Sequence, residues 1–172
     1  MEIIMEALKR VSPEKVGIHS QCIVDFIRQV RAEGIELHSL MILRHGKVCE
    51  EAWWKPYDSG TPQTMFSFSK SITSTAVGFA VQEGLLSLDE KLVDLFPNET
   101  PENPGENVKA ADVYSLLTMS CGQESDIYYK LKSYDHWIHD FMHAEFKYKP
   151  GTMFQYNSTG TDMLCAFIKK KT

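Results

Sequence analysis

Residues 65–73 read Met-Phe-Ser-Phe-Ser-Lys-Ser-Ile-Thr, and the interpretation of the whole chain starts from this stretch. Within it, Ser67 and Lys70 begin an apolar segment that continues to Glu83 with helical periodicity. On a helix, a spacing of three residues puts both side chains on one face. A nearby amine can take the proton of a serine hydroxyl, and a helix N-terminus favours developing negative charge. The stretch therefore indicates a nucleophilic serine with a lysine beside it.

The Ser-x-x-Lys pattern is not specific by itself. Ser12-Pro-Glu-Lys15 is a second match, in a polar segment without an apolar helix behind it. Taken alone, Ser67 and Lys70 are more consistent with a helix cap followed by a surface lysine than with a catalytic pair. The choice between these interpretations depends on the surrounding sequence.

Three further segments follow residues 65–73 in chain order. Residues 83–97 contain Glu-Gly-Leu-Leu-Ser-Leu-Asp-Glu and end in Phe-Pro; residues 116–122 read Leu-Leu-Thr-Met-Ser-Cys-Gly; residues 150–158 read Pro-Gly-Thr-Met-Phe-Gln-Tyr-Asn-Ser. Together with residues 65–73, they resemble the serine β-lactamase and penicillin-binding-protein-like superfamily. Within it, the resemblance is to the class C β-lactamase-related, esterase-like group.

The resemblance covers the chain from about Val16 to its last residue, and it includes Leu43-Arg-His-Gly-Lys47 followed by a Trp-Trp pair. It implies an α+β, β-lactamase/transpeptidase-like fold, of which residues 1–172 are the N-terminal part of one domain. That part comprises an N-terminal helix, a first β-hairpin, the nucleophile helix and a helical subdomain at about residues 85–155. The C-terminal strands are missing.

In the family, one of those missing strands carries a third motif, Lys-Thr-Gly or His-x-Gly, and one of two backbone amides that bind the oxyanion. Losing one such donor costs on the order of 10²–10³ in rate. The resemblance therefore implies that this short chain is weak or inactive alone.

The resemblance also assigns roles to residues of this chain. Ser67 is the acylated nucleophile, Lys70 its proton acceptor or relay, and Tyr156 the second base. Asn157 and Ser158 are the substrate-binding residues, and Ser158 stands where the family's Tyr-x-Asn triplet has asparagine, as in esterase-like members. The implied reaction is hydrolysis of a small-molecule ester or amide through an acyl-serine intermediate. No metal or organic cofactor is implied.

Hydrophobic periodicity and turn residues predict the local structure. Two extended runs around a short turn with Gly46 predict a β-hairpin. The predicted strands are residues 37–44 and 48–54, and the predicted helices are residues 20–34, 67–83, 110–119, 134–143 and 162–170.

Composition limits the classes of function. With 43% hydrophobic residues and a formal net charge of -5, the chain has the composition of a soluble globular protein and not of a basic nucleic-acid-binding protein. No apolar stretch approaches the roughly 20 residues needed to cross a bilayer. Glu2 and Glu6 stand where a signal peptide would be basic, and four cysteines are scattered without metal-ligand spacing. A cytoplasmic protein without membrane or nucleic-acid partners is expected.

Two alternatives remain open. His136, His139 and His143 share one helical face, which suits either a zinc site or, with more support, a solvated face. The chain is also consistent with a non-catalytic fragment or binding module. Such a fragment would pair with a missing half or form a homo-oligomer, because an open sheet edge recruits further strands.

Overall fold

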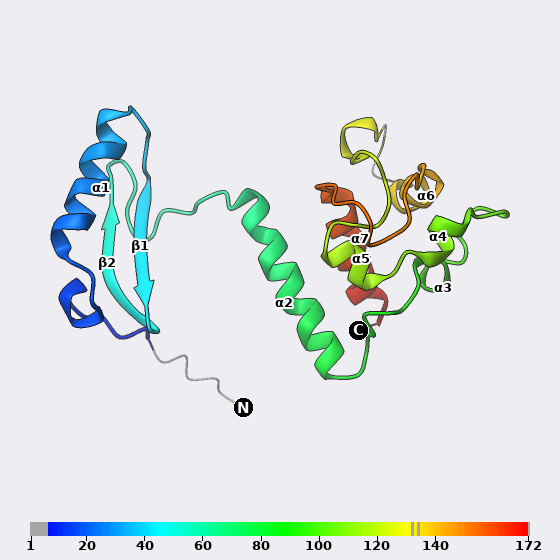
Figure 1. Cartoon of the computed structure of the whole chain (residues 1–172), viewed down its shortest axis with the longest axis horizontal. Coiled ribbons are helices and arrows are strands. Elements are labelled where there is room, and N and C mark those ends of the chain that lie inside the picture. The colour runs from blue at the N-terminus through cyan, green and yellow to red at the C-terminus, as the bar shows by residue number, and fades with distance from the viewer. Residues whose placement is uncertain (1–6, 132, 134, 172) are drawn as a thin grey trace. The chain divides into compact units, whose positions relative to one another are not determined.

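The computed structural model describes residues 7–131, 133 and 135–171. The chain divides into two compact units, Met1–Thr64 and Met65–Thr172 (Figure 1). The first unit contains a helix and a two-stranded antiparallel sheet, and the second is helical in its described residues. This mixture is the predicted α+β class.

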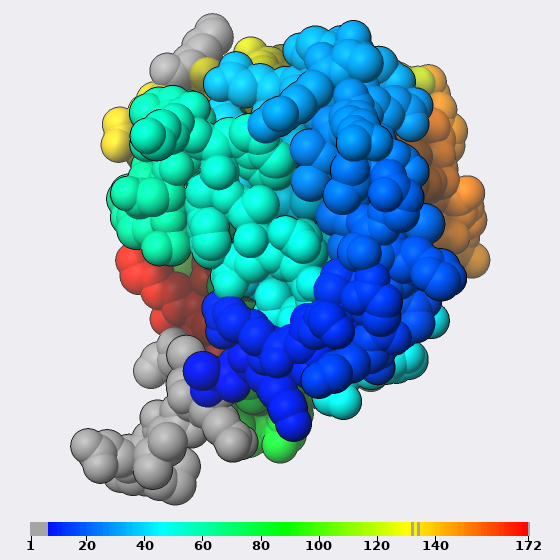
Figure 2. Space-filling model, turned by 90° about the vertical axis from the view of Figure 1, so that its left-hand side faces the viewer, coloured from blue at the N-terminus to red at the C-terminus, as the bar shows by residue number. Residues whose placement is uncertain are grey.

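The first unit is built from a helix and a hairpin. Its elements are η1 (Pro13–Val16), α1 (Ser20–Ala32), β1 (Ser39–Arg44) and β2 (Lys47–Trp53). His45 and Gly46 both have positive φ, 52° and 68°, which is the geometry of a tight two-residue hairpin turn. In Figure 2 the side chains of α1, in blue, lie against those of the hairpin, in cyan. The predicted hairpin is confirmed.

The two strands of the hairpin differ in what lies along their outer edges. The register runs from Ser39 opposite Trp53 to Arg44 opposite Lys47, with an irregularity between Ile42 and Leu43. On the outer side of β2, Val48 donates its N–H to the Lys9 carbonyl and accepts a bond from the Val11 N–H, each at 2.9 Å. Within the described residues, β1 pairs with β2 alone.

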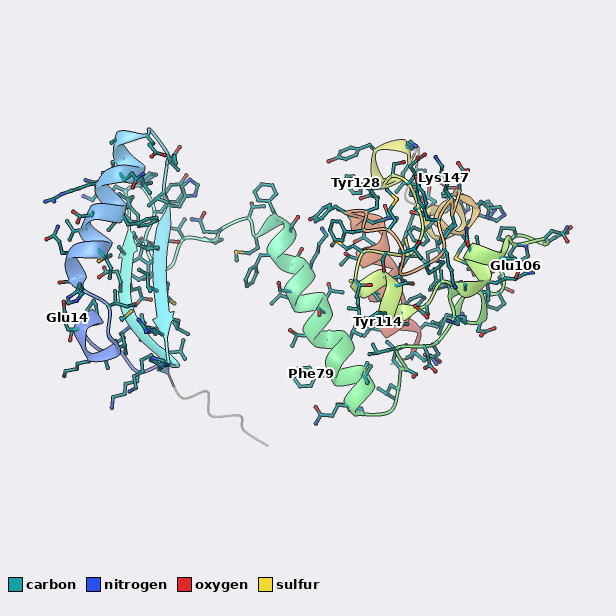
Figure 3. The ribbon with its side chains drawn as sticks, in the orientation of Figure 1. Glu14, Phe79, Glu106, Tyr114, Tyr128 and Lys147 are labelled. Carbon is teal, nitrogen blue, oxygen red and sulfur yellow. The ribbon has the colours of Figure 1, made fainter. Side chains whose placement is uncertain are left out.

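In the second unit, several helices pack around the last helix of the chain. Its elements are η2 (Phe66–Phe68), α2 (Ser69–Gln82), α3 (Leu92–Leu95), α4 (Glu106–Ala110), α5 (Val113–Leu117), η3 (Tyr128–Lys130), α6 (Trp137–His143) and α7 (Ser158–Lys171). Met163 and Phe167 of α7 are completely buried, as are Phe141, Leu92 and Val113 around them. Burying each of these side chains stabilises the fold by about 1.5–3 kcal/mol. By contrast, α2 presents Phe79 to solvent (Figure 3).

Several predicted helix boundaries shift, and the helix predicted over residues 110–119 is the shorter α5, Val113–Leu117. The closing helix begins at Ser158, four residues before the predicted start, because the Asn157 side chain accepts a hydrogen bond from the Gly160 N–H and caps the helix. The helix predicted over residues 134–143 is α6, Trp137–His143, and Tyr134 lies outside the described residues. Ser67 lies in η2, one turn before α2, and not inside the α-helix.

Candidate active site

Ser67 is held in a short 3-10 turn at the start of α2. The preceding residue, Phe66, has φ of 43°, a conformation that side-chain-bearing residues rarely adopt, and its carbonyl accepts a 2.7 Å hydrogen bond from Ser69 Oγ. The turn leads directly into the helix, so Ser67 and Lys70 share one face. Lys70 Nζ lies 3.5 Å from Ser67 Oγ. The local sequence therefore produces the predicted serine–lysine pair.

Tyr156, which is distant from Ser67 in the sequence, completes the cluster. Its hydroxyl donates a 2.6 Å hydrogen bond to Ser67 Oγ across 89 residues of sequence. Lys70 Nζ lies 5.0 Å from the centre of the Tyr156 ring. The contact with Ser67, followed by that with the Lys70 amine, holds the pKa of Tyr156 below its usual value. The structure thus brings together the three residues that the sequence predicts as catalytic.

A backbone ladder places Tyr156 at this point. Gln155 N–H donates to the Met119 carbonyl at 2.8 Å, Gly151 N–H to the Ser120 carbonyl at 2.8 Å, and Tyr148 N–H to the Gly122 carbonyl at 2.9 Å. These three bonds join residues 119–122 to residues 148–155 and so connect two motifs, residues 116–122 and 150–158, that lie about thirty residues apart in the sequence. The motifs therefore form one structural unit beside Ser67.

Gly122 is essential to this ladder. Its φ is 105°, and a Cβ at this position would lie 2.2 Å from the carbonyl oxygen of Tyr148. That separation is far shorter than any normal contact, so a side chain would force the two backbone segments apart. Glycine is required here by both conformation and space.

The two predicted substrate-binding residues have different surroundings. Asn157 is 2% exposed, and its carboxamide donates to Gln123 Oε1 at 2.8 Å while accepting from Gly160 N–H at 2.7 Å. The structure uses this side chain inside the fold and does not bring it to Ser67. Ser158 is partly exposed at the start of α7. Contact of either residue with substrate stays a prediction.

Sequence reasoning missed Asp126. Its carboxylate accepts hydrogen bonds from the N–H groups of Ser158 at 2.5 Å, Thr159 at 3.3 Å and Tyr128 at 3.0 Å, and from the Thr159 hydroxyl at 2.7 Å. Burial would raise the pKa of Asp126, but the hydrogen bonds outweigh it and lower the pKa. Asp126 therefore anchors the N-terminus of α7, next to Tyr156. No local pattern identifies this role, because its partners on α7, Ser158 and Thr159, lie more than thirty residues away in the sequence.

The histidine face was the other candidate site. The rings of His139 and His143 stack with centroids 3.8 Å apart, and His143 Nδ1 lies 2.9 Å from the His139 carbonyl oxygen. Among residues 7–131, 133 and 135–171, no three His, Cys, Asp or Glu side chains are grouped as metal ligands. Separately, no helix in the described part of the chain is both long enough and apolar enough to span a bilayer.

Comparisons with known proteins concern the family and the fold. The family model for Beta-lactamase matches residues 23–171. A curated relative from Dichelobacter nodosus, named "Probable fimbrial assembly protein FimD, serogroup H1", is 28% identical over 170 residues, covering 84% of this chain. The chain spans 41% of that relative's length.

Solved structures show the same partial coverage. The octameric penicillin-binding protein homologue from Pyrococcus abyssi matches 90% of this chain with a TM-score of 0.68 and 27% identity, over 39% of its own chain. A "putative beta-lactamase" from Bacteroides dorei matches 89% with a TM-score of 0.71 and 15% identity, over 46% of its own chain. At 15% identity, the second likeness concerns the fold alone. The expected β-lactamase/transpeptidase-like fold, present in part, is confirmed.

Proposed function

The chain belongs to the beta-lactamase family, and from this premise we propose that it is the nucleophile-bearing part of a serine hydrolase. In this proposal the substrate is a small-molecule ester or amide, and the reaction passes through an acyl-serine intermediate. Ser67 is the nucleophile, and Lys70 and Tyr156 move protons. Ser158, at the start of α7, contacts the substrate.

The observation that carries the proposal is the 2.6 Å contact between the Tyr156 hydroxyl and Ser67 Oγ, with Lys70 Nζ at 3.5 Å from the same oxygen. A serine hydroxyl is a weak nucleophile unless an adjacent base takes its proton. Two such groups converge on Ser67 from separate segments, and Ser67 itself is exposed, so an acyl donor can reach it. The lowered pKa of Tyr156 brings its phenolate closer to the working pH range.

The proton path follows from these contacts. In its phenolate form, Tyr156 Oη takes the proton of Ser67 as Oγ forms a bond to the substrate carbonyl carbon, and the leaving group receives that proton as its bond to the carbonyl carbon breaks. In the second step the same groups activate a water, which displaces the acid from Ser67. The N–H of Ser67 itself is one donor for the oxyanion.

Covalent labelling tests the proposal directly. We expect a fluorophosphonate to add one phosphonyl group to the full chain, detected by intact-mass spectrometry, and Ser67→Ala to abolish the adduct. Ser12→Ala is the matched control, because Ser12 and Lys15 have the same spacing without a tyrosine partner, and it should retain full labelling. Well-folded protein without an adduct, or an adduct that survives Ser67→Ala, would refute the proposed function.

A second proposal concerns association of the chain with itself, and the supporting observation is the free side of β1. Within the described residues β1 pairs only with β2, and its Met41 and Leu43 are half exposed. Unpaired strand edges recruit strands from other chains. Sedimentation should therefore show a concentration-dependent mass, and Leu43→Lys should reduce it. A monomer at all concentrations would contradict this second proposal.

We also place the protein in the cytoplasm. The support for this is that the cysteines are free thiols, all four of them at described positions, as is usual in a reducing compartment. Fractionation of cells that express the tagged chain tests the placement.

A further inference from the structure

Helices α2 and α7 pack side by side and run in the same direction. At their N-terminal ends, Tyr156 contacts Ser67. About one turn into α2 and two turns into α7, Thr73 Oγ1 lies 3.4 Å from Cys165 Sγ. Farther along, residues of both helices line one cavity that includes Ala76. The residue numbers of the contacting pairs increase along both helices, so α2 and α7 are parallel and both lead away from the candidate active site.

This register places Asp162 opposite Lys70. Lys70 is three residues before Thr73, and Asp162 is three residues before Cys165, so each lies one turn nearer the active site than the contact pair. An electrostatic interaction joins the two side chains. Partial desolvation raises the pKa of the Asp162 carboxyl, Lys70 lowers it, and the charge of Asp126 raises it further.

The two carboxylates near the site differ in what they bind. Asp126 is occupied by the N–H groups at the start of α7 and the Thr159 hydroxyl. The Asp162 side chain forms no hydrogen bond or salt bridge with residues in the described ranges. Lys70 faces Ser67 on η2, Tyr156 before α7, and Asp162 on α7. The charge of Lys70 therefore acts on the Asp162 carboxylate, whereas the charge of Asp126 acts on both Tyr156 and Asp162.

The pair of Lys70 and Tyr156 can share its protons in two ways. Either Lys70 is a cation beside a Tyr156 phenolate, or both groups are neutral and the amine is the base. A fixed negative charge near Lys70 favours the first arrangement. We propose that Asp162 is the positioning residue that keeps Lys70 cationic, so that Tyr156 and not Lys70 takes the proton of Ser67. This inference rests on the proposed serine-hydrolase function.

The two arrangements predict opposite changes in the rate of fluorophosphonate addition to Ser67 when the charge of Asp162 is removed. If Asp162 supports the cation, Asp162→Asn should slow labelling at neutral pH by about three- to tenfold, since a partly exposed charge pair is screened by water. Asp162→Glu should restore most of the rate. Asp94→Asn, which removes the same charge from an exposed position on α3, should leave the rate unchanged. Labelling that is faster or unchanged in Asp162→Asn would overturn the proposal.

A second measurement does not depend on activity. Nuclear magnetic resonance of ¹³C-labelled aspartate follows the pKa of Asp162 in the full chain and in Lys70→Gln. Loss of Lys70 should raise the pKa of Asp162, because the interaction is reciprocal; an unchanged pKa would overturn the proposal. If Ser67 is not labelled but the pKa of Asp162 rises, the hydrolase proposal fails while the charge pairing of Asp162 with Lys70 stands.

Discussion

Gly122→Ala should destabilise the second unit more than any other single methyl group added to a glycine with positive φ in the described residues. Two costs combine at this position. The positive φ costs an alanine about 1–2 kcal/mol. The new Cβ also meets the Tyr148 carbonyl at 2.2 Å, so the backbone must move and the 2.9 Å bond between Tyr148 N–H and the Gly122 carbonyl is weakened. That bond contributes about 1 kcal/mol. The total is about 3 kcal/mol.

Gly84→Ala is the matched control. Gly84 also has positive φ, 72°, but a Cβ there would have no atom within 4 Å. Only the conformational cost remains, about 1–2 kcal/mol. The difference between the two variants therefore isolates the close approach of residues 122 and 148.

Thermal unfolding followed by circular dichroism measures both variants. For a chain of this size, 1 kcal/mol corresponds to about 2–4 °C in Tm. We expect Gly122→Ala to lower Tm by about 6–12 °C and Gly84→Ala by about 2–8 °C, with the larger fall in Gly122→Ala. Equal shifts in the two variants would refute the reasoning, since the contact with Tyr148 would then contribute nothing. Fluorophosphonate labelling of Ser67 should also fall in Gly122→Ala, because the ladder positions Tyr156.

Three further predictions concern the site. Tyr156→Phe should slow fluorophosphonate labelling of Ser67 by about 10²–10⁴, the usual contribution of a proton-transfer group, and unchanged labelling would exclude Tyr156 as the base. In an ultraviolet titration at alkaline pH, subtracting the Tyr156→Phe curve should reveal a phenol that ionises below the usual value of 10.0; a midpoint at or above it would contradict the geometry. Because folding lowers the pKa of Asp126 from its usual 3.8, its contribution to stability is complete above that value and is lost as the pH falls through the folded value. Urea denaturation should therefore show stability falling below about pH 4, and Asp126→Asn, less stable at neutral pH, should show a shallower fall; parallel curves would argue against this role of Asp126.

Local sequence patterns were enough to predict several elements of the fold. The Gly46 turn between alternating runs predicts the hairpin, and the apolar period after Ser67 predicts α2, because both depend on side chains only a few residues apart. The same locality places Lys70 beside Ser67. The start of α7 depends on both ranges, because Asn157 caps the helix from the adjacent position whereas Asp126, which binds its first N–H groups, lies more than thirty residues away in the sequence.

The sequence by itself determined the elements, the Ser67–Lys70 pair and, through its motifs, the family. Only the tertiary structure decided which distant groups surround that pair. It brought the Tyr156 hydroxyl to Ser67 through the ladder at Gly122, directed the Asn157 carboxamide into the fold, and set Asp162 opposite Lys70. The physical reason is range: backbone conformation follows from neighbouring residues, whereas the position of a charge or a hydroxyl relative to a nucleophile depends on how whole segments pack.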